Sequence, residues 1–122
     1  MVRNKSLLQA ANVNIVQGIR IEEVQMGTGR RAESGKKVKV NYVGKFKTTG
    51  RVFDASTGRP FSFRLGRSEV IKGWDIGVQG MLVGGKRILT IPPEKAYGKS
   101  GAPPTIPPNS TLVFEVTLLE VV

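Results

Sequence analysis

The sequence of 122 residues contains no cysteine and no histidine. The lack of cysteine excludes disulfides, thiolate zinc sites and a cysteine nucleophile. The lack of histidine excludes a histidine-based catalytic triad and removes the commonest metal ligand. No apolar run approaches the roughly 20 residues that cross a membrane, and the first residues contain no secretory-signal core. We therefore expect no metal, no cofactor and no membrane association.

Aromatic residues are few and are confined to one part of the chain. The single tryptophan is Trp74, and all other aromatic residues lie between positions 42 and 114. Residues 1–17 contain none, are polar and show no sustained period. We therefore predict a polar, basic N-terminal arm or linker over residues 1–17 and a single globular domain over residues 18–122, because one domain is the default for this length.

The net charge of +10 is unevenly distributed along the chain. Between positions 30 and 51 there are eight lysine or arginine residues and one acid, Glu33. Such a surface attracts acidic proteins or nucleic acid, although a solvated basic face explains it as well. The sequence leaves both interpretations open. We expect an intracellular protein, cytoplasmic or nuclear, that is a monomer.

Alternating side chains predict strands. Residues 36–47 place apolar side chains on one face and lysines on the other, which is the pattern of a half-buried strand in an antiparallel sheet. The two faces are Val38, Val40, Tyr42 and Phe46 against Lys37, Lys39, Lys45 and Lys47. Further strands are predicted near residues 19–24, 52–54, 61–65, 87–91 and 112–118, and a long loop rich in proline and glycine over residues 92–108.

A different spacing predicts one helix. Apolar residues recur at i, i+4, i+7 and i+8 on one helical face, namely Trp74, Val78, Met81 and Leu82. Three glycines within this segment weaken its helix propensity, so packing against the sheet must hold it. The order of elements predicts an α+β fold, a curved antiparallel β-sheet of five to six strands wrapped around one short α-helix.

The aromatic residues could form a bowl over the indole of Trp74. Six of them are candidates for its wall, although an ordinary core is the alternative interpretation for each: Tyr42, Phe53, Phe61, Trp74, Tyr97 and Phe114. The hydroxyls of the two tyrosines would need partners if buried. Asp54 is either a turn-forming residue or a carboxylate of this site. Two glycine patterns that imitate nucleotide-binding loops, at 27–32 and 80–86, are each followed by a strand and not by the required helix.

At these residues the chain resembles the FKBP-type peptidyl-prolyl isomerases, the immunophilins that bind tacrolimus and rapamycin. The similarity covers residues 18–122. The matching stretches are Asn41-Tyr42-Val43-Gly44, Val52-Phe53-Asp54, Arg59-Pro60-Phe61-Ser62-Phe63, Leu65-Gly66, residues 69–75, Gly84-Gly85-Lys86-Arg87, Ala96-Tyr97-Gly98 and residues 106–116.

The resemblance implies an FKBP-like fold with a pocket between the sheet and the helix, and it assigns the site residues. Trp74 would form the floor, and the Tyr97 hydroxyl and the Ile71 amide would donate hydrogen bonds to substrate or drug carbonyls. The implied catalytic residues are Tyr42, Phe53, Asp54, Trp74, Tyr97 and Phe114. The implied ligand contacts are Phe61, Glu69, Val70, Ile71 and Ile106. The implied partners are proline-containing peptides and proteins, together with the two macrolides.

The chain departs from the family pattern in its loops. Ala102 stands where many members have histidine, Thr105 replaces a common isoleucine or valine, and the loop over residues 54–61 is shorter. Arg59 is the candidate for the arginine that in the family pairs with the pocket aspartate. These departures concern peptide preference and drug affinity more than catalysis.

The chemistry implied by the resemblance suits a chain without cysteine or histidine. The barrier to rotation about a peptide bond is about 18–20 kcal/mol, and uncatalysed X-Pro exchange takes tens of seconds or more. A twisted amide carries less charge separation than a planar one, so an apolar pocket should favour it. We therefore expect a peptidyl-prolyl cis-trans isomerase, an enzyme of protein folding. The alternative is a non-enzymatic peptide-binding or chaperone module whose basic face binds acidic partners or nucleic acid.

Overall fold

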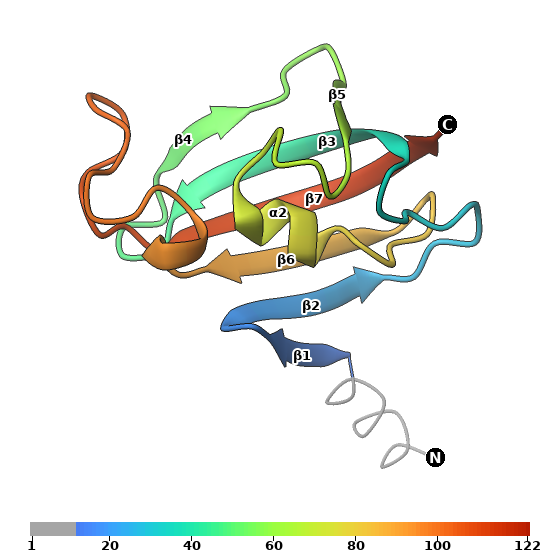
Figure 1. Cartoon of the computed structure of the whole chain (residues 1–122), viewed down its shortest axis with the longest axis horizontal. Coiled ribbons are helices and arrows are strands. Elements are labelled where there is room, and N and C mark those ends of the chain that lie inside the picture. Colours follow the sequence, from blue (N-terminus) through green and yellow to red (C-terminus); the bar gives the residue numbers. More distant parts are fainter. Residues whose placement is uncertain (1–11) are drawn as a thin grey trace.

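Among the residues that the structure describes, seven strands form one antiparallel sheet, and one short helix lies across a face of it (Figure 1). The computed structural model describes residues 12–122. The strand order is β1-β2-β6-β7-β3-β4, and β4 and β5 pair with successive halves of β3. The predicted α+β class and the sheet around a helix are confirmed. The elements are β1 (Val13–Val16), β2 (Ile19–Gln25), β3 (Lys37–Phe46), β4 (Val52–Ala55), β5 (Phe61–Arg64), α2 (Lys72–Gly77), β6 (Lys86–Ile91), η1 (Pro93–Lys95) and β7 (Leu112–Val121).

Strand β3 has the alternation that the sequence predicted, and its apolar face is part of the core. Val38 and Val40 are fully buried. The neighbouring strand β7 buries alternate residues in the same way, namely Leu112, Phe114, Val116 and Leu118. Because successive strand residues point to opposite faces, the core lies between this inner face of the sheet and helix α2.

The lysine face of β3 is partly neutralised by β7. Lys39 forms an ion pair with Glu120 at 3.4 Å, and Lys45 forms one with Glu115 at 2.9 Å. The hydrogen bond from Lys45 lowers the pKa of the Glu115 carboxyl below its usual value. The other two lysines of this face are exposed and make no ion pair within residues 12–122. Binding of an acidic protein or nucleic acid here stays a prediction, with fewer free charges than the sequence suggested.

Two glycines let helix α2 approach strand β6 closely. A Cβ atom on Gly73 would lie 2.5 Å from two atoms of the Ile91 side chain, and one on Gly77 would lie 2.8 Å from Leu89. Ile91 and Leu89 are fully buried beneath the helix. The sequence identified these glycines only as a weakness of the helix, whereas the structure gives them a packing role.

The helix is shorter than the sequence predicted. It ends at Gly77, so Met81 and Leu82 lie beyond it. Gly80 has a φ of +90°, which lies in the left-handed region, so the chain cannot continue as a right-handed helix there. Met81 is nevertheless fully buried, so the spacing identified a buried face but not the end of the helix. Within residues 12–122, no helix is long and apolar enough to cross a membrane.

Part of the stretch predicted as an arm is a strand of the sheet. Strand β1 (Val13–Val16) pairs with β2 and is the outermost strand among the described residues. Gln17 and Gly18 connect the two strands with φ values of 49° and 83°, and two positive φ values in a two-residue loop are typical of a hairpin turn. This strand raises the number of strands to seven. Residues 1–11 lie outside the described residues, and the boundary at residue 18 stays a prediction.

Candidate active site

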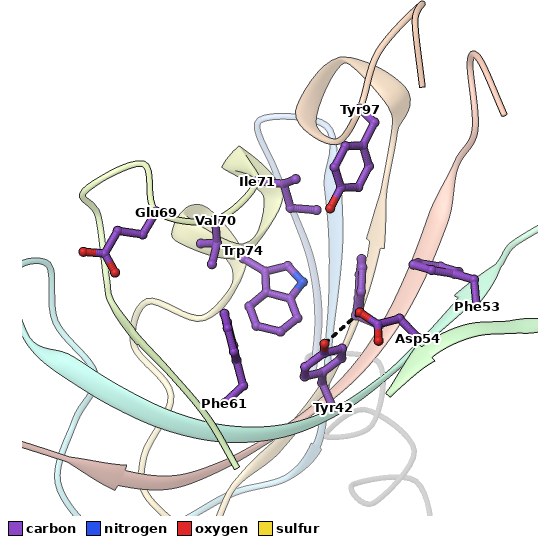
Figure 2. Close-up of a pocket in the computed structure, with 10 residues that line it drawn as sticks. Tyr42, Phe53, Asp54, Phe61, Glu69, Val70, Ile71, Trp74 and Tyr97 are labelled. Atoms are coloured by element: carbon purple, nitrogen blue, oxygen red, sulfur yellow. Dashed lines mark hydrogen bonds between the residues drawn. The ribbon is translucent and has the colours of Figure 1, made fainter. Parts of the chain in front are cut away.

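A cavity of about 280 Å³ opens between helix α2 and the strands on one side of it (Figure 2). Its lining side chains come from β3, β4, β5, β7, the segment before and within α2, and the loop after η1. It brings together ten of the eleven residues that the sequence assigned to the site: Tyr42, Phe53, Asp54, Phe61, Glu69, Val70, Ile71, Trp74, Tyr97 and Phe114. We refer to this cavity as the aromatic cup.

The indole of Trp74 forms the floor of the aromatic cup. Only 4% of this residue is exposed. Three rings stand almost perpendicular to it: Tyr42 at 5.0 Å and 81°, Phe114 at 5.3 Å and 89°, and Phe61 at 5.9 Å and 77° between ring centroids and planes. Edge-to-face contacts of this kind are favourable. They fix the floor and walls together, so the cup is a preformed apolar surface.

A tyrosine holds the carboxylate of Asp54 at the wall of the cup. The Tyr42 hydroxyl donates to Oδ2 of Asp54 at 2.8 Å (Figure 2), and the Ala55 amide donates to Oδ1 at 2.9 Å. Within residues 12–122, Asp54 forms no ion pair with Arg59 or any other cation. The suggestion that Arg59 pairs with this aspartate is therefore wrong, and Tyr42 orients the carboxylate instead.

Several hydrogen-bond donors at the cup have no protein acceptor within the described part of the chain, among them the buried Nε1 of Trp74. The Tyr97 side chain is 41% exposed, and its hydroxyl donates to no acceptor there; nor does the Ile71 amide, which immediately precedes helix α2. Burial, and then the charge of Asp54, raise the pKa of Tyr97 above its ordinary value, so its hydroxyl is protonated at neutral pH. The Tyr97 hydroxyl and the Ile71 amide are both available to a carbonyl of a bound molecule.

Two predicted ligand contacts lie differently from the others. Ile106 is 5% exposed and does not line the cup; it lines an adjoining depression of about 320 Å³ that shares Phe53, Asp54 and Tyr97 with it. Glu69 borders the cup, but its carboxylate points away from the indole (Figure 2) and accepts a hydrogen bond from the backbone amide of residue 64. Glu69 therefore shapes the rim and holds the loop before α2.

Sequence reasoning missed one residue that shapes the cup. Gly44 lies within β3, near its end, and a Cβ atom there would lie 2.7 Å from the ring of Phe114 and 2.9 Å from the ring of Phe53. Any side chain at this position would displace both rings. A glycine inside a strongly alternating strand was the available signal, because such a glycine often marks a close approach of other groups.

Tyr42 gives the site an alkaline pH dependence. Burial, then the hydrogen bond to Asp54 and its charge, raise the pKa of Tyr42 from 10.0 to about 12. Because the folded state holds the phenolic proton more tightly than the unfolded state, this stabilisation is fully present below about pH 10 and is lost as the pH rises through about 12. We expect the free energy of unfolding, measured by urea denaturation, to fall over this range. In Tyr42→Phe the free energy of unfolding should decrease less over this pH range. An equal decrease in the variant and the wild type would contradict the role of the Tyr42 hydroxyl.

The comparisons with known proteins agree with this geometry. The model of the family described as FKBP-type peptidyl-prolyl cis-trans isomerase matches residues 28–119. The chain is 56% identical over 107 residues to FK506-binding protein 4 of Dictyostelium discoideum, and 54% identical over 105 residues to the 39 kDa FK506-binding nuclear protein of Drosophila melanogaster. These alignments cover 88% and 85% of this chain but only 29% of either relative.

Solved structures show the same fold. The crystal structure of AtFKBP13 superposes with a TM-score of 0.82 at 40% identity, covering 90% of this chain and 98% of that one. A peptidyl-prolyl cis-trans isomerase of Pseudomonas syringae pv. tomato superposes with a TM-score of 0.81 at 37% identity, covering 98% of this chain and 91% of that one. The chain thus spans nearly all of these structures, but less than a third of the two curated relatives.

Proposed function

This chain belongs to the FKBP-type peptidyl-prolyl cis-trans isomerases, and we propose that its aromatic cup is where a prolyl ring binds and rotation about the preceding bond is accelerated. The observation that carries this proposal is an open cavity of about 280 Å³ with an indole floor and aromatic walls. A five-membered ring offers only apolar surface to such walls. The activity, substrates and partners of a longer protein that contained this chain are likewise proposals.

The proposed mechanism is preferential binding of the twisted amide. Rotation breaks amide conjugation, so the twisted state has less charge separation and loses less by leaving water for the apolar cup. The amide of Ile71 and the hydroxyl of Tyr97 are free to hold substrate carbonyls on either side of the prolyl ring. Asp54, fixed by Tyr42, places a negative charge that orients the carbonyl of the rotating bond with its carbon end toward the carboxylate. No nucleophile is required.

The isomerase assay tests this assignment directly. Wild-type protein should accelerate cis-trans exchange of an X-Pro peptide, measured by NMR exchange or by a coupled protease. Asp54→Ala should lower kcat/KM about tenfold, which corresponds to about 1.4 kcal/mol of transition-state stabilisation. Glu33→Ala removes an exposed acid outside the cup and is the matched control. Equal activity in the two variants would refute the role of Asp54, and no acceleration by wild-type protein would refute the cup as a catalytic site.

The same cup is proposed to bind macrolides. Tacrolimus and rapamycin would place apolar ring atoms over the indole of Trp74 and accept hydrogen bonds from Ile71 and Tyr97. Quenching of the fluorescence of the only tryptophan would report binding. Binding of peptide or macrolide without any acceleration would favour the non-enzymatic peptide-binding module instead.

We also propose an intracellular location, which is supported by the name of the nuclear relative of Drosophila melanogaster.

A further inference from the structure

A second cavity, unrelated to the aromatic cup, lies on the other side of helix α2. Its volume is about 440 Å³, and it shares no lining residue with the cup. One wall is the outer strand β1 with the residues flanking it, and the other is the end of α2 with the turn that follows. Four carboxamide side chains and three charged ones border it: Asn12, Asn14, Gln17, Gln79, Glu23, Arg31 and Arg87. We call this cavity the amide groove.

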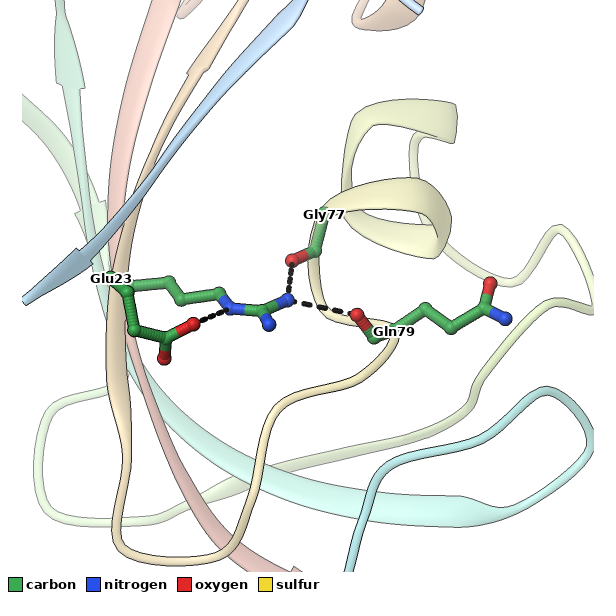
Figure 3. Close-up of polar contacts among 4 residues, drawn as sticks. Glu23, Gly77 and Gln79 are labelled. Atoms are coloured by element: carbon green, nitrogen blue, oxygen red, sulfur yellow. Dashed lines mark hydrogen bonds and ion pairs between the residues drawn. The ribbon is translucent and has the colours of Figure 1, made fainter. Parts of the chain in front are cut away.

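An ion pair with well-defined geometry forms the floor of the amide groove. Nε of Arg87 donates to Oε1 of Glu23 at 2.9 Å, and both side chains are only about one-seventh exposed, at 13% and 14%. Nη1 of Arg87 also donates to the carbonyl oxygens of Gly77 and Gln79, at 2.9 and 2.8 Å (Figure 3). These contacts use Nε and Nη1. They hold the guanidinium rigidly, so a ligand that binds its Nη2 does not have to immobilise the arginine side chain.

One oxygen of this ion pair lacks a donor. Oε2 of Glu23 is buried and accepts no hydrogen bond from residues 12–122. A buried acceptor without a donor is unfavourable, because it has lost its hydrogen bonds to water. Glu23 lines the amide groove, so a small movement of its side chain would expose this oxygen to an N–H group of a bound molecule.

Two guanidinium groups approach the same point beside Gly80. Nη2 of Arg31 and Nη2 of Arg87 both lie 3.6 Å from the point where a Cβ atom of Gly80 would be. Gly80 has no side chain to fill this space, and its φ of +90° disfavours any other residue. Arg31 is exposed and forms no ion pair within residues 12–122. Two positive groups facing one open space are suited to a carboxylate, which guanidinium groups bind through paired hydrogen bonds.

We propose that the amide groove binds an acidic, extended peptide segment. A carboxylate of the peptide lies between Arg31 and Arg87, a backbone N–H donates to Oε2 of Glu23, and the carboxamide of Asn14 pairs with the peptide backbone. The net charge of +10 attracts such a partner from a distance. Peptide is favoured over nucleic acid, because a phosphate backbone brings only acceptors to the unpaired carboxylate oxygen of Glu23.

The test uses a short, blocked peptide of alternating glutamate and valine without proline, which has no prolyl ring for the aromatic cup. Its Kd is measured by calorimetry, and its position by amide shifts of the ¹⁵N-labelled protein at Gly80 and Gln79. Arg31→Glu should weaken binding about tenfold or more, with isomerase activity and melting temperature unchanged. Lys47→Glu makes the same charge change at an exposed residue outside the groove, and should weaken binding less than about twofold.

Three results would overturn the proposal. The first is that the peptide does not bind. The second is that the two charge-reversed variants lose affinity for the peptide equally, which would mean that net charge alone attracts it. The third is a single-stranded oligonucleotide of equal charge that binds as tightly as the peptide and depends on Arg31 to the same extent, which would identify a general polyanion site. None of these three results depends on the aromatic cup, so they are independent of the isomerase assignment.

Discussion

Replacing Gly73 by alanine is expected to destabilise the protein by about 2 kcal/mol, although alanine is the better helix former. Intrinsic propensity alone predicts a gain of about 1 kcal/mol for this change within a helix. The contact with β6 predicts the opposite, because the new Cβ would lie 2.5 Å from Cδ1 and Cγ2 of Ile91 and 2.8 Å from its Cγ1. Ile91 is fully buried and cannot move aside. The helix must therefore shift away from the sheet, and it carries the adjacent Trp74 with it.

Urea denaturation followed by Trp74 fluorescence measures this loss, and the isomerase assay should show reduced activity under conditions where the variant is still folded. The matched experiment is the double variant Gly73→Ala with Ile91→Ala, which removes all the clashing atoms. Its destabilisation should be clearly smaller than the sum of the two single effects, because neighbouring substitutions that relieve one clash are not additive. A stabilised Gly73→Ala variant, or strict additivity, would show that the contact does not limit the packing of the helix.

Phe53→Ala should lower kcat/KM about thirtyfold while leaving the domain folded. The ring stands in the wall of the aromatic cup, 5.7 Å from the ring of Phe114, and is only half-buried. A contact between this ring and the twisted amide that stabilises the transition state by about 2 kcal/mol accounts for the thirtyfold loss in kcat/KM. Its removal also opens the cup to water, which favours the planar, more polar amide.

The control for this variant is Phe46→Ala. Phe46 packs against Phe53, with ring centroids 4.9 Å apart and planes tilted by 35°, but does not line the cup. Each substitution removes one phenyl ring of this pair, but only Phe53→Ala removes a ring that lines the cup. We expect the activity of Phe46→Ala to fall less than about threefold, since only the support of Phe53 is lost. Equal losses in kcat/KM for both variants would mean that the pair acts through stability and not through contact with the substrate.

The elements with strong periodicity could be predicted from the sequence. Strands β3 and β7 alternate cleanly because each has one face in the core, and both were placed correctly. The end of helix α2 could not be predicted, because Met81 continues the helical spacing and is buried, although Gly80 has already left the helical conformation. Strand β1 could not be predicted either. It has only four residues and lies at the edge of the sheet, where Ile15 is 67% exposed, so the brief alternation from Asn12 to Ile15 is too short to identify a strand.

The site was predicted through the family resemblance and not through periodicity. The residues of the aromatic cup come from positions 42 to 114, and no local pattern brings them together. Details that depend on exact side-chain positions were missed. They are the hydrogen bond from Tyr42 to Asp54, the position of Ile106 in an adjoining depression, and the close approach of two aromatic rings to Gly44. The amide groove was missed entirely, because it is built by β1 and by a turn that the sequence assigned to a helix.

The hairpin formed by β1 and β2 affects where this domain can be shortened. Trimming the chain to Gly18, where the sequence pattern alone begins the domain, would remove the row of backbone partners from β2. The amides and carbonyls of Ile19 and Ile21 would then face solvent along a bare flank, next to apolar side chains that are now covered. Unpaired edges recruit strands from neighbouring molecules, and proteins limit this with short edge strands. With four residues, β1 leaves a shorter exposed edge than the seven residues of β2 would.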